Sequence, residues 1–178
     1  DGSGGTTEYF RIDGGQEVNI FSKNIKLEDN VMGMFGGGND LKIRHNGTDS
    51  FIENETGNLT IKNSADDKDI IFQSDDGSGG TTTYITLDGS AKRIDIPDDI
   101  RLTLGTSDDL QIYHNATNSV IENQTGDFFI KNNTDDGDIK FQCDDGSGGV
   151  TEYFRLDGGA SITVVSREMR FADNVKLK

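Results

Sequence analysis

The feature that most constrains this sequence is a long tandem repeat. The pentapeptide DGSGG begins at Asp1, Asp76 and Asp145, so its copies recur at an offset of 75 and then of 69. Residues 40–80 match residues 109–149 without a gap, and 27 of these 41 positions are identical. Such a repeat usually folds as one recurring unit that shares its core with its neighbours. We therefore interpret the chain as repeat unit 1 (1–75), repeat unit 2 (76–144) and partial repeat unit 3 (145–178).

The first unit is six residues longer than the second. We place the extra residues between Gly15 and Asp40, around Met32–Gly38. The end of the chain fits the first unit, because Ser166–Val175 aligns with Ser22–Val31. Since the chain opens and stops inside the repeat, we expect it to be a fragment of a longer array that forms one continuous shaft.

The composition predicts a thin core and excludes some partners. Only 31% of the residues are hydrophobic, which is low for a globular domain. A thin core suggests stabilisation by a partner chain or by stacked repeats. The formal net charge of −15 argues against binding nucleic acid phosphates or anionic membranes. There is also no apolar run of about 18 residues, so we expect no transmembrane helix.

Short alternating segments bounded by Asn, Asp, Gly or Thr indicate an all-β chain. In the second unit we predict seven strands, at residues 84–87, 93–96, 100–104, 110–113, 120–121, 128–131 and 139–142. Each strand has only two or three apolar side chains, and an isolated hairpin is marginal in water. We therefore predict an elongated repeat β-fibre, as a homotrimeric intertwined triple-stranded β-helix or prism. A single-chain β-solenoid remains the alternative.

Two histidines are the only candidates for a transition-metal site. His45 and His114 align between the units, in the segments IRHN and IYHN. In a trimer, one histidine from each chain could meet at the axis and offer three nitrogens to a metal. Alternation places His114 on the face of Leu110 and Ile112, so a packing role at a strand end is the competing interpretation.

The acidic segments are candidates for calcium, and none of them indicates catalysis. DDGSGG offers two carboxylates and a hydroxyl, but it lacks the spacing of an EF-hand loop. Asp and Gly also build tight turns, which is the simpler interpretation. No nucleophile is paired with a base, so we predict that the protein is not an enzyme and uses no cofactor. Neither a phosphate loop nor a disulfide framework is present, since Cys143 is the only cysteine.

The motif Asn-x-Thr could mark glycan acceptors, although Asn and Thr also serve as turn residues. It occurs at six positions: Asn46, Asn54, Asn58, Asn115, Asn123 and Asn132.

Three segments resemble repeats in structural and tail-fibre proteins of marine tailed phages, notably those of cyanobacteria. They are DLQIYHNATNSVIEN at 109–123, GDFFIKN at 126–132 and FQCDDGSGGVTEYFRLDG at 141–158. The sequence departs from that pattern at Arg44, where Tyr is usual, and at Asn46 and Asn115, where Asp is common.

The resemblance implies a homotrimeric shaft of a virion appendage, located on a virion or outside the cell. Such a shaft spaces and presents a distal receptor-binding tip, and the host-surface receptor would bind through parts outside this segment. The alternatives are an extracellular repeat filament and a calcium-dependent β-solenoid adhesin. In the shaft, Tyr9, Tyr84 and Tyr153 after DGSGG would anchor each layer together with Phe10 and Phe154.

Overall fold

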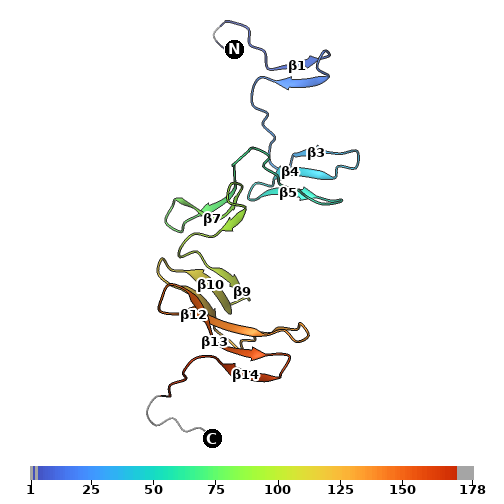
Figure 1. The fold of residues 1–178 in the computed structure, drawn as a ribbon. Helices are drawn as coiled ribbons and strands as arrows, with labels where there is room; N and C mark the ends of the chain where they lie inside the picture. The colour runs from blue at the N-terminus through green and yellow to red at the C-terminus, as the bar shows by residue number, and fades with distance from the viewer. Residues whose placement is uncertain (1, 3, 172–178) are drawn as a thin grey trace. The chain divides into compact units, whose positions relative to one another are not determined.

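The computed structural model describes residue 2 and residues 4–171. The described chain contains strands and no helix, which confirms the all-β prediction (Figure 1). The strands form five small sheets, and within each sheet the neighbours in space are also neighbours along the chain. Because short loops join them, these neighbours run antiparallel.

The sheets contain two or three strands each. The first has β1 (Phe10–Asp13) and β2 (Val18–Phe21), and the second has β3 (Met32–Phe35), β4 (Leu41–His45) and β5 (Ser50–Asn54). The third has β6 (Ile70–Asp75), β7 (Thr81–Asp88) and β8 (Arg93–Asp95), and the fourth has β9 (Leu102–Leu104), β10 (Leu110–His114) and β11 (Ser119–Asn123). The fifth has β12 (Ile139–Asp144), β13 (Val150–Asp157) and β14 (Ile162–Val165).

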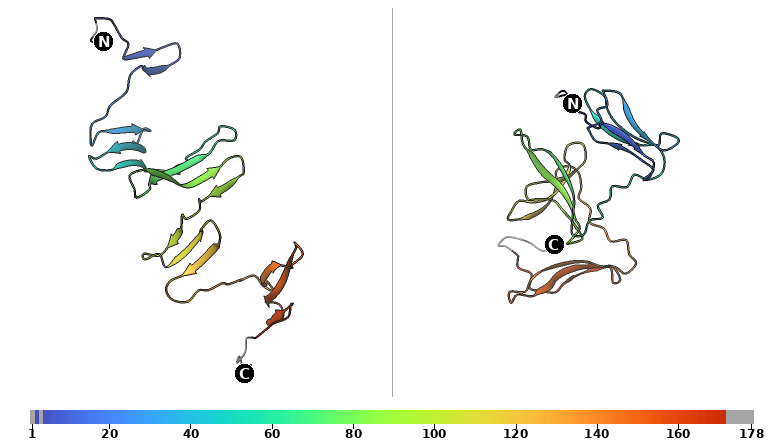
Figure 2. Two further views of the ribbon diagram at one scale, coloured as in Figure 1. Left: turned by 90° about the vertical axis from the view of Figure 1, so that its left-hand side faces the viewer. Right: turned by 90° about the horizontal axis from the view of Figure 1, so that it is seen from above.

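The chain divides into two compact units. One comprises residues 1–70 and 89–91 and holds the first two sheets. The other comprises residues 71–88 and 92–178 and holds the third sheet, apart from the first residue of β6, together with the last two. Figure 2 gives two further views, in which each sheet can be followed as its own ribbon.

The repeat in the sequence corresponds to a repeated pair of sheets. The sheet β3–β4–β5 recurs as β9–β10–β11: Leu41 pairs with Asn54 in the first, and Leu110 pairs with Asn123 in the second. The sheet β6–β7–β8 recurs as β12–β13–β14. One repeat unit therefore encodes two different three-stranded sheets.

The six extra residues lie between Gly15 and Asp40, as predicted, but earlier than the predicted place around Met32–Gly38. The β1–β2 hairpin matches the β7–β8 hairpin at an offset of 75, through its last residue Phe21. From Glu28 onward the offset is 69: the Val31 N–H donates to the Glu28 carbonyl as the Ile100 N–H donates to the Pro97 carbonyl. The insertion is therefore residues 22–27, and the placement around Met32–Gly38 was wrong because those residues belong to β3 and its turn.

Six of the seven strands predicted in the second unit are confirmed, with small shifts of their ends. The strand predicted at residues 128–131 is wrong for the single chain. Its residues are mostly apolar, but no strand of the described chain lies beside them to form a ladder. An apolar β-forming pattern shows that a segment suits a sheet, whereas only an adjacent strand makes it part of one.

No apolar side chain of the described residues is buried. The single buried residue among them is Gln111, at 8% exposure. Large apolar residues in the strands stay open, among them Ile52 at 61% and Ile121 at 62%. The composition predicted a thin core, and within the described part of one chain there is no closed core at all.

Candidate functional site

Each sheet of the β3–β4–β5 type has one apolar face and one polar face. Cross-strand partners share a face, so the register places Ile43 beside Ile52 and His45 beside Ser50. Leu41 and Asn54 complete this side of β4 and β5, and Phe35 of β3 joins it opposite Leu41. The side chains at 42, 44, 51 and 53 lie on the other face. We call the first side the apolar face.

The second copy builds the same face from the same residue types. In β10 and β11, Ile112 pairs with Ile121 and His114 pairs with Ser119. Leu102 and Leu104 of β9 extend the face opposite Ile112 and Leu110. Ile43 is 48% exposed and Ile112 is 41% exposed, so neither copy of the apolar face is covered.

The two faces differ sharply in how well the copies agree. On β4 and β5 the six residues of the apolar face are all identical in β10 and β11: Leu, Ile, His, Ser, Ile and Asn. On the opposite face only Glu53 has an identical counterpart, Glu122, while Lys42, Arg44 and Phe51 are replaced. On these two strands, the uncovered face is therefore the one whose residues repeat without change.

The opposite face satisfies its own polar groups. In the first copy, Arg44 donates to the Glu53 carboxylate at 2.6 Å and lies over the Phe51 ring at 4.0 Å from its centroid. The Glu53 carboxylate keeps its pKa below the usual range because Arg44 donates to it. Lys42 donates to Glu55 at 2.7 Å. The charged groups of this face are therefore paired with one another, and the face can stay in contact with water.

The second copy reaches the same result with different chemistry. Arg101 donates to the Gln111 side chain at 2.7 Å and lies over the Tyr113 ring at 4.5 Å from its centroid. The Tyr113 hydroxyl lies 3.4 Å from a carboxylate oxygen of Glu122. Arg101 comes from the residue before β9, whereas the arginine of the first copy sits on β4 itself.

Both histidines lie at the end of the apolar face. The Nδ1 atom of His45 lies 3.1 Å from the Ser50 hydroxyl, and that of His114 lies 3.2 Å from the Ser119 hydroxyl. The register confirms that His114 shares a face with Ile112, as alternation predicted. Residues 2 and 4–171 contain no group of three His, Cys, Asp or Glu side chains that could hold a metal. A metal ring of His45 or His114 would need three chains, and it stays a prediction.

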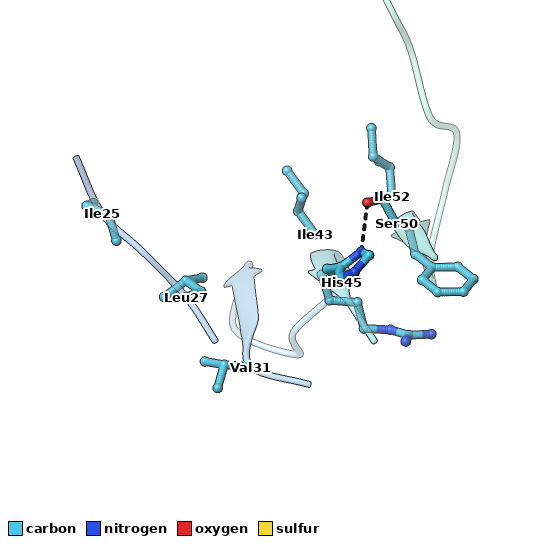
Figure 3. Close-up of a pocket in the computed structure, with 9 residues that line it drawn as sticks. Ile25, Leu27, Val31, Ile43, His45, Ser50 and Ile52 are labelled. Carbon is cyan, nitrogen blue, oxygen red and sulfur yellow. Dashed lines mark hydrogen bonds between the residues drawn. The ribbon is translucent and has the colours of Figure 1, made fainter. Parts of the chain in front are cut away.

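An open groove lies over the apolar face of the first copy. It has a volume of about 540 Å³ and is lined by Ile25, Leu27, Val31, Ile43, Arg44, His45, Ser50, Phe51 and Ile52. Figure 3 shows Ile25 and Leu27 on one side of the groove and Ile43 and Ile52 on the other. Two of the lining residues thus come from the six-residue insertion.

The insertion supplies an apolar side chain beside a position where β3 has only a glycine. Gly33 stands opposite Ile43 where the second copy has Leu102 opposite Ile112. A β-carbon placed on Gly33 would lie 3.9 Å from Leu27 Cδ1, so Leu27 fills the space above the glycine. The first copy therefore restores its apolar face with a residue from outside the sheet.

The DDGSGG segments form closed loops in which aspartates accept hydrogen bonds. Asp76 Oδ1 accepts the Ser78 hydroxyl at 2.7 Å, the Ser78 N–H at 2.7 Å and the Gly80 N–H at 3.0 Å. These donors, the Ser78 hydroxyl first, hold the pKa of Asp76 below its ordinary value. Asp145 has the same partners in the second loop. A carboxylate oxygen with three donors fits a turn better than a calcium site.

Tyrosine fixes each of these two loops from the following strand. The Tyr84 hydroxyl donates to the Asp75 carbonyl at 2.9 Å, and the Tyr153 hydroxyl donates to the Asp144 carbonyl at 3.0 Å. Tyr9, the third tyrosine of the set, is 61% exposed. Two of the predicted anchoring tyrosines thus brace a hairpin loop.

Five of the six Asn-x-Thr motifs hold turns through the asparagine side chain, and the sixth, at Asn58, lies in an extended segment. The amides of Asn54, Asn123 and Asn132 each donate to backbone carbonyls nearby. The side-chain oxygens of Asn46 and Asn115 accept backbone N–H groups of the β4–β5 and β10–β11 turns. A glycan would replace a hydrogen of the side-chain amide. The bonds that the amides of Asn54, Asn123 and Asn132 donate therefore favour the turn interpretation.

The sequence reasoning placed Leu110, Ile112 and His114 on one face of a strand, but it missed which residues of the neighbouring strand extend that face. It also missed the roles of Ile25 and Leu27. The signal was present: the six identical residues alternate along two segments that match at an offset of 69. The groove could not be inferred, since it depends on where the insertion lies.

Comparison with protein-family models, with curated proteins and with solved structures finds no match to this chain. Among the described residues, no helix is long and apolar enough to cross a membrane.

Proposed function

We propose that this chain is a self-associating structural segment of an extracellular fibre, in which copies of the chain cover one another's apolar faces. The observation that carries the proposal is the agreement between the two copies of the β4–β5 face. All six of its residues are identical between copies although the face is uncovered. A surface in contact with water accepts substitution, as the opposite face does.

The energetics support coverage by another chain. Burying an isoleucine side chain is worth roughly 1.5–3 kcal/mol. Ile43, Ile52, Ile112 and Ile121 all remain more than 40% exposed. A three-stranded sheet with one uncovered apolar face lacks the second layer that stable domains have.

The sheets β12–β13–β14 and β1–β2 extend the same argument. Phe141 stacks on Phe154 with the ring centroids 4.3 Å apart, and the Phe10 centroid lies 4.9 Å from that of Phe21. Phe141 is 39% exposed and Phe154 is 38% exposed, so these aromatic pairs still present open surface. Both sheet types of the repeat therefore have an apolar side for a partner.

We propose three copies, arranged so that each contributes one face of a prism. The resemblance of residues 109–123 and 141–158 to phage tail-fibre repeats supports this number and supports a virion appendage as the setting. In that setting the segment is a shaft that spaces a receptor-binding tip from a particle. It performs no catalysis and has no resident cofactor.

The test is the molar mass of the full chain in solution, measured by light scattering during size-exclusion chromatography. One chain has a mass of 19.4 kDa, and we expect a particle of three. A particle of two chains would replace the prism with a face-to-face sandwich. A single-chain mass at high protein concentration would refute self-association.

A further inference from the structure

Each of the first two repeat units has one extended segment between two sheets, and this segment lies outside every ladder of the described chain. Residues 58–62 (NLTIK) connect β5 to β6, and residues 127–131 (DFFIK) connect β11 to β12. Their residues belong to no strand, turn or bend. The backbone hydrogen bonds of the described chain include none from these residues. Within the described chain, both segments therefore present N–H and C=O groups that no other backbone group pairs with.

Each segment is held at its start by an asparagine. The Asn54 amide donates to the carbonyls of Thr56 and Gly57 at 2.8 and 3.1 Å. The Asn123 amide makes the same two bonds, to Thr125 and Gly126, at 2.8 and 3.0 Å. The turn that leads into each segment is thus fixed in the same way in both copies.

A second asparagine holds the end of each segment. The Asn63 amide donates to the Asp69 carbonyl at 2.9 Å, and the Ala65 N–H donates to the Asn63 side-chain oxygen at 3.0 Å. Asn132 repeats both bonds, with the Asp138 carbonyl and the Thr134 N–H. The turns on both sides of each segment are therefore fixed, although nothing within the described chain pairs with the backbone between them.

The segments are apolar and exposed. Leu59 is 50% exposed and Ile61 is 62% exposed, while Phe128 and Ile130 are 49% and 58% exposed. The Lys131 ammonium lies 4.7 Å from the centroid of the Phe129 ring, as two residues on one side of an extended segment can. Extended, apolar and unpaired backbone is a template for another strand, and proteins normally cover or interrupt it.

We propose that residues 59–62 and 128–131 are intermolecular β-strands, each pairing with an edge strand of a neighbouring copy of this chain. The proposal rests on the proposed function, because it requires an assembly of copies. It assigns the backbone contact within that assembly, in addition to the burial of the apolar faces. Addition of a strand to a sheet edge supplies main-chain hydrogen bonds whatever the side chains are.

The occupant is inferred from the repeat itself. The two segments stand one repeat apart in the sequence, with the same asparagine turns on both sides. A partner that pairs with both segments must present an equivalent edge in each of two successive repeats. A second copy of this chain meets that requirement by construction.

Hydrogen–deuterium exchange of the full chain in its assembled form tests the pairing directly. We expect amides 59–62 and 128–131 to exchange at least about tenfold more slowly than the amides of unstructured peptides of the same sequence under the same conditions. Equal exchange rates in a particle of three chains would overturn the strand pairing and leave the proposed function standing. A single-chain particle would overturn both.

A pair of double variants separates backbone pairing from side-chain burial. Thr60→Pro with Phe129→Pro removes one N–H donor from each segment, and the described chain shows no backbone bond from either N–H that would be lost. Thr60→Ala with Phe129→Ala shortens the same side chains and keeps both donors. We expect the proline variant to dissociate at a protein concentration at least about tenfold higher than the alanine variant. Equal dissociation of the two variants would contradict intermolecular pairing.

Discussion

The sheets β3–β4–β5 and β9–β10–β11 have the same register, and their two long strands differ almost entirely on one face. Their polar faces use different chemistry: an Arg44–Glu53 ion pair in one and an Arg101–Gln111 hydrogen bond in the other. Their apolar faces are identical along the two long strands. The comparison shows that the side whose polar groups are already satisfied is the variable one, and the open apolar side is the constant one.

This pattern is opposite to that of a self-contained domain. In such a domain the buried positions resist change and the exposed positions vary. Here Val120 is half-buried within the single chain and stands where the first copy has Phe51, whereas Ile121 is 62% exposed and matches Ile52. Exposure within one chain would therefore predict a constant residue at position 120 and a variable one at position 121, the reverse of what the two copies show. The observed pattern fits a second chain that covers the apolar face.

The largest effect on the assembly should come from charges placed on the apolar face, at Ile52 of β5 and Ile121 of β11. We expect Ile52→Asp with Ile121→Asp to abolish the assembly, because each change removes roughly 1.5–3 kcal/mol of burial and adds a charge to an apolar contact. The measurement is the molar mass by light scattering, which should fall from three chains to one.

The matched variant carries the same charges one position earlier. Phe51→Asp with Val120→Asp alters the polar face and should leave the particle at three chains. If Val120 and Phe51 prove to be the more sensitive positions, the single-chain pattern of burial is correct and the apolar face is not an interface.

A second effect concerns the two DDGSGG loops, which join β6 to β7 and β12 to β13. The pKa values of Asp76 and Asp145 are lowered, first by the serine hydroxyl and then by backbone N–H groups. A carboxyl whose folded pKa is lowered stabilises the fold fully above its unfolded pKa, about 4. That contribution is lost as the pH falls through the lower folded value. We therefore expect the urea midpoint to fall between about pH 5 and pH 2.

The aspartates of the loops should account for part of that slope. Asp76→Asn with Asp145→Asn should give a shallower fall over the same range of pH. Asp66→Asn with Asp127→Asn removes the same charge from residues for which the structure gives no hydrogen bond, and should leave the slope of the wild type. Equal slopes for the two double variants would show that the loop carboxylates carry no special share.

Much of the fold could be predicted from the sequence, because local patterns encode strands and turns. The alternation in LQIY at 110–113 predicted β10 to within one residue, and Asp88-Gly89 marked the turn before β8. The same alternation correctly placed His114 beside Ile112. These features depend only on the side-chain period of two and on residues that favour turns.

The errors arose where a structure depends on neighbours that the sequence does not name. Residues 128–131 have the pattern of a strand, yet pairing requires a partner that the described chain does not supply. The insertion at 22–27 was misplaced because glycine-rich residues 36–38 suggested an added loop, whereas both copies have a turn there. The residues that pair across the sheet with Leu110 and Ile112 were missed for the same reason, since a surface exists only once two strands are placed side by side.

A smaller effect tests whether the polar faces are interchangeable. Lys42→Gln with Arg44→Tyr gives the first copy the β10 residues of the second. Exposed ion pairs contribute little, so we expect three chains and a thermal midpoint close to that of the wild type. The measurement is thermal unfolding followed by circular dichroism. If the thermal midpoint falls as far as it does for Ile52→Asp with Ile121→Asp, this face also forms a contact.

The smallest effect should come from the hydroxyl that orients each histidine. Ser50→Ala with Ser119→Ala removes the partners of the two Nδ1 atoms, and a single hydrogen bond at this exposure is worth at most about 1 kcal/mol. We expect a slightly lower thermal midpoint for this variant, and we expect EDTA to leave the wild-type assembly intact, because a packing role at the strand end needs no metal. If EDTA dissociates the wild-type assembly, and Zn²⁺ restores it but fails to restore His45→Asn with His114→Asn, then three rings bind a metal at the axis. In that case the identity of His45 and His114 would reflect metal binding, and packing alone would explain only the isoleucines beside them.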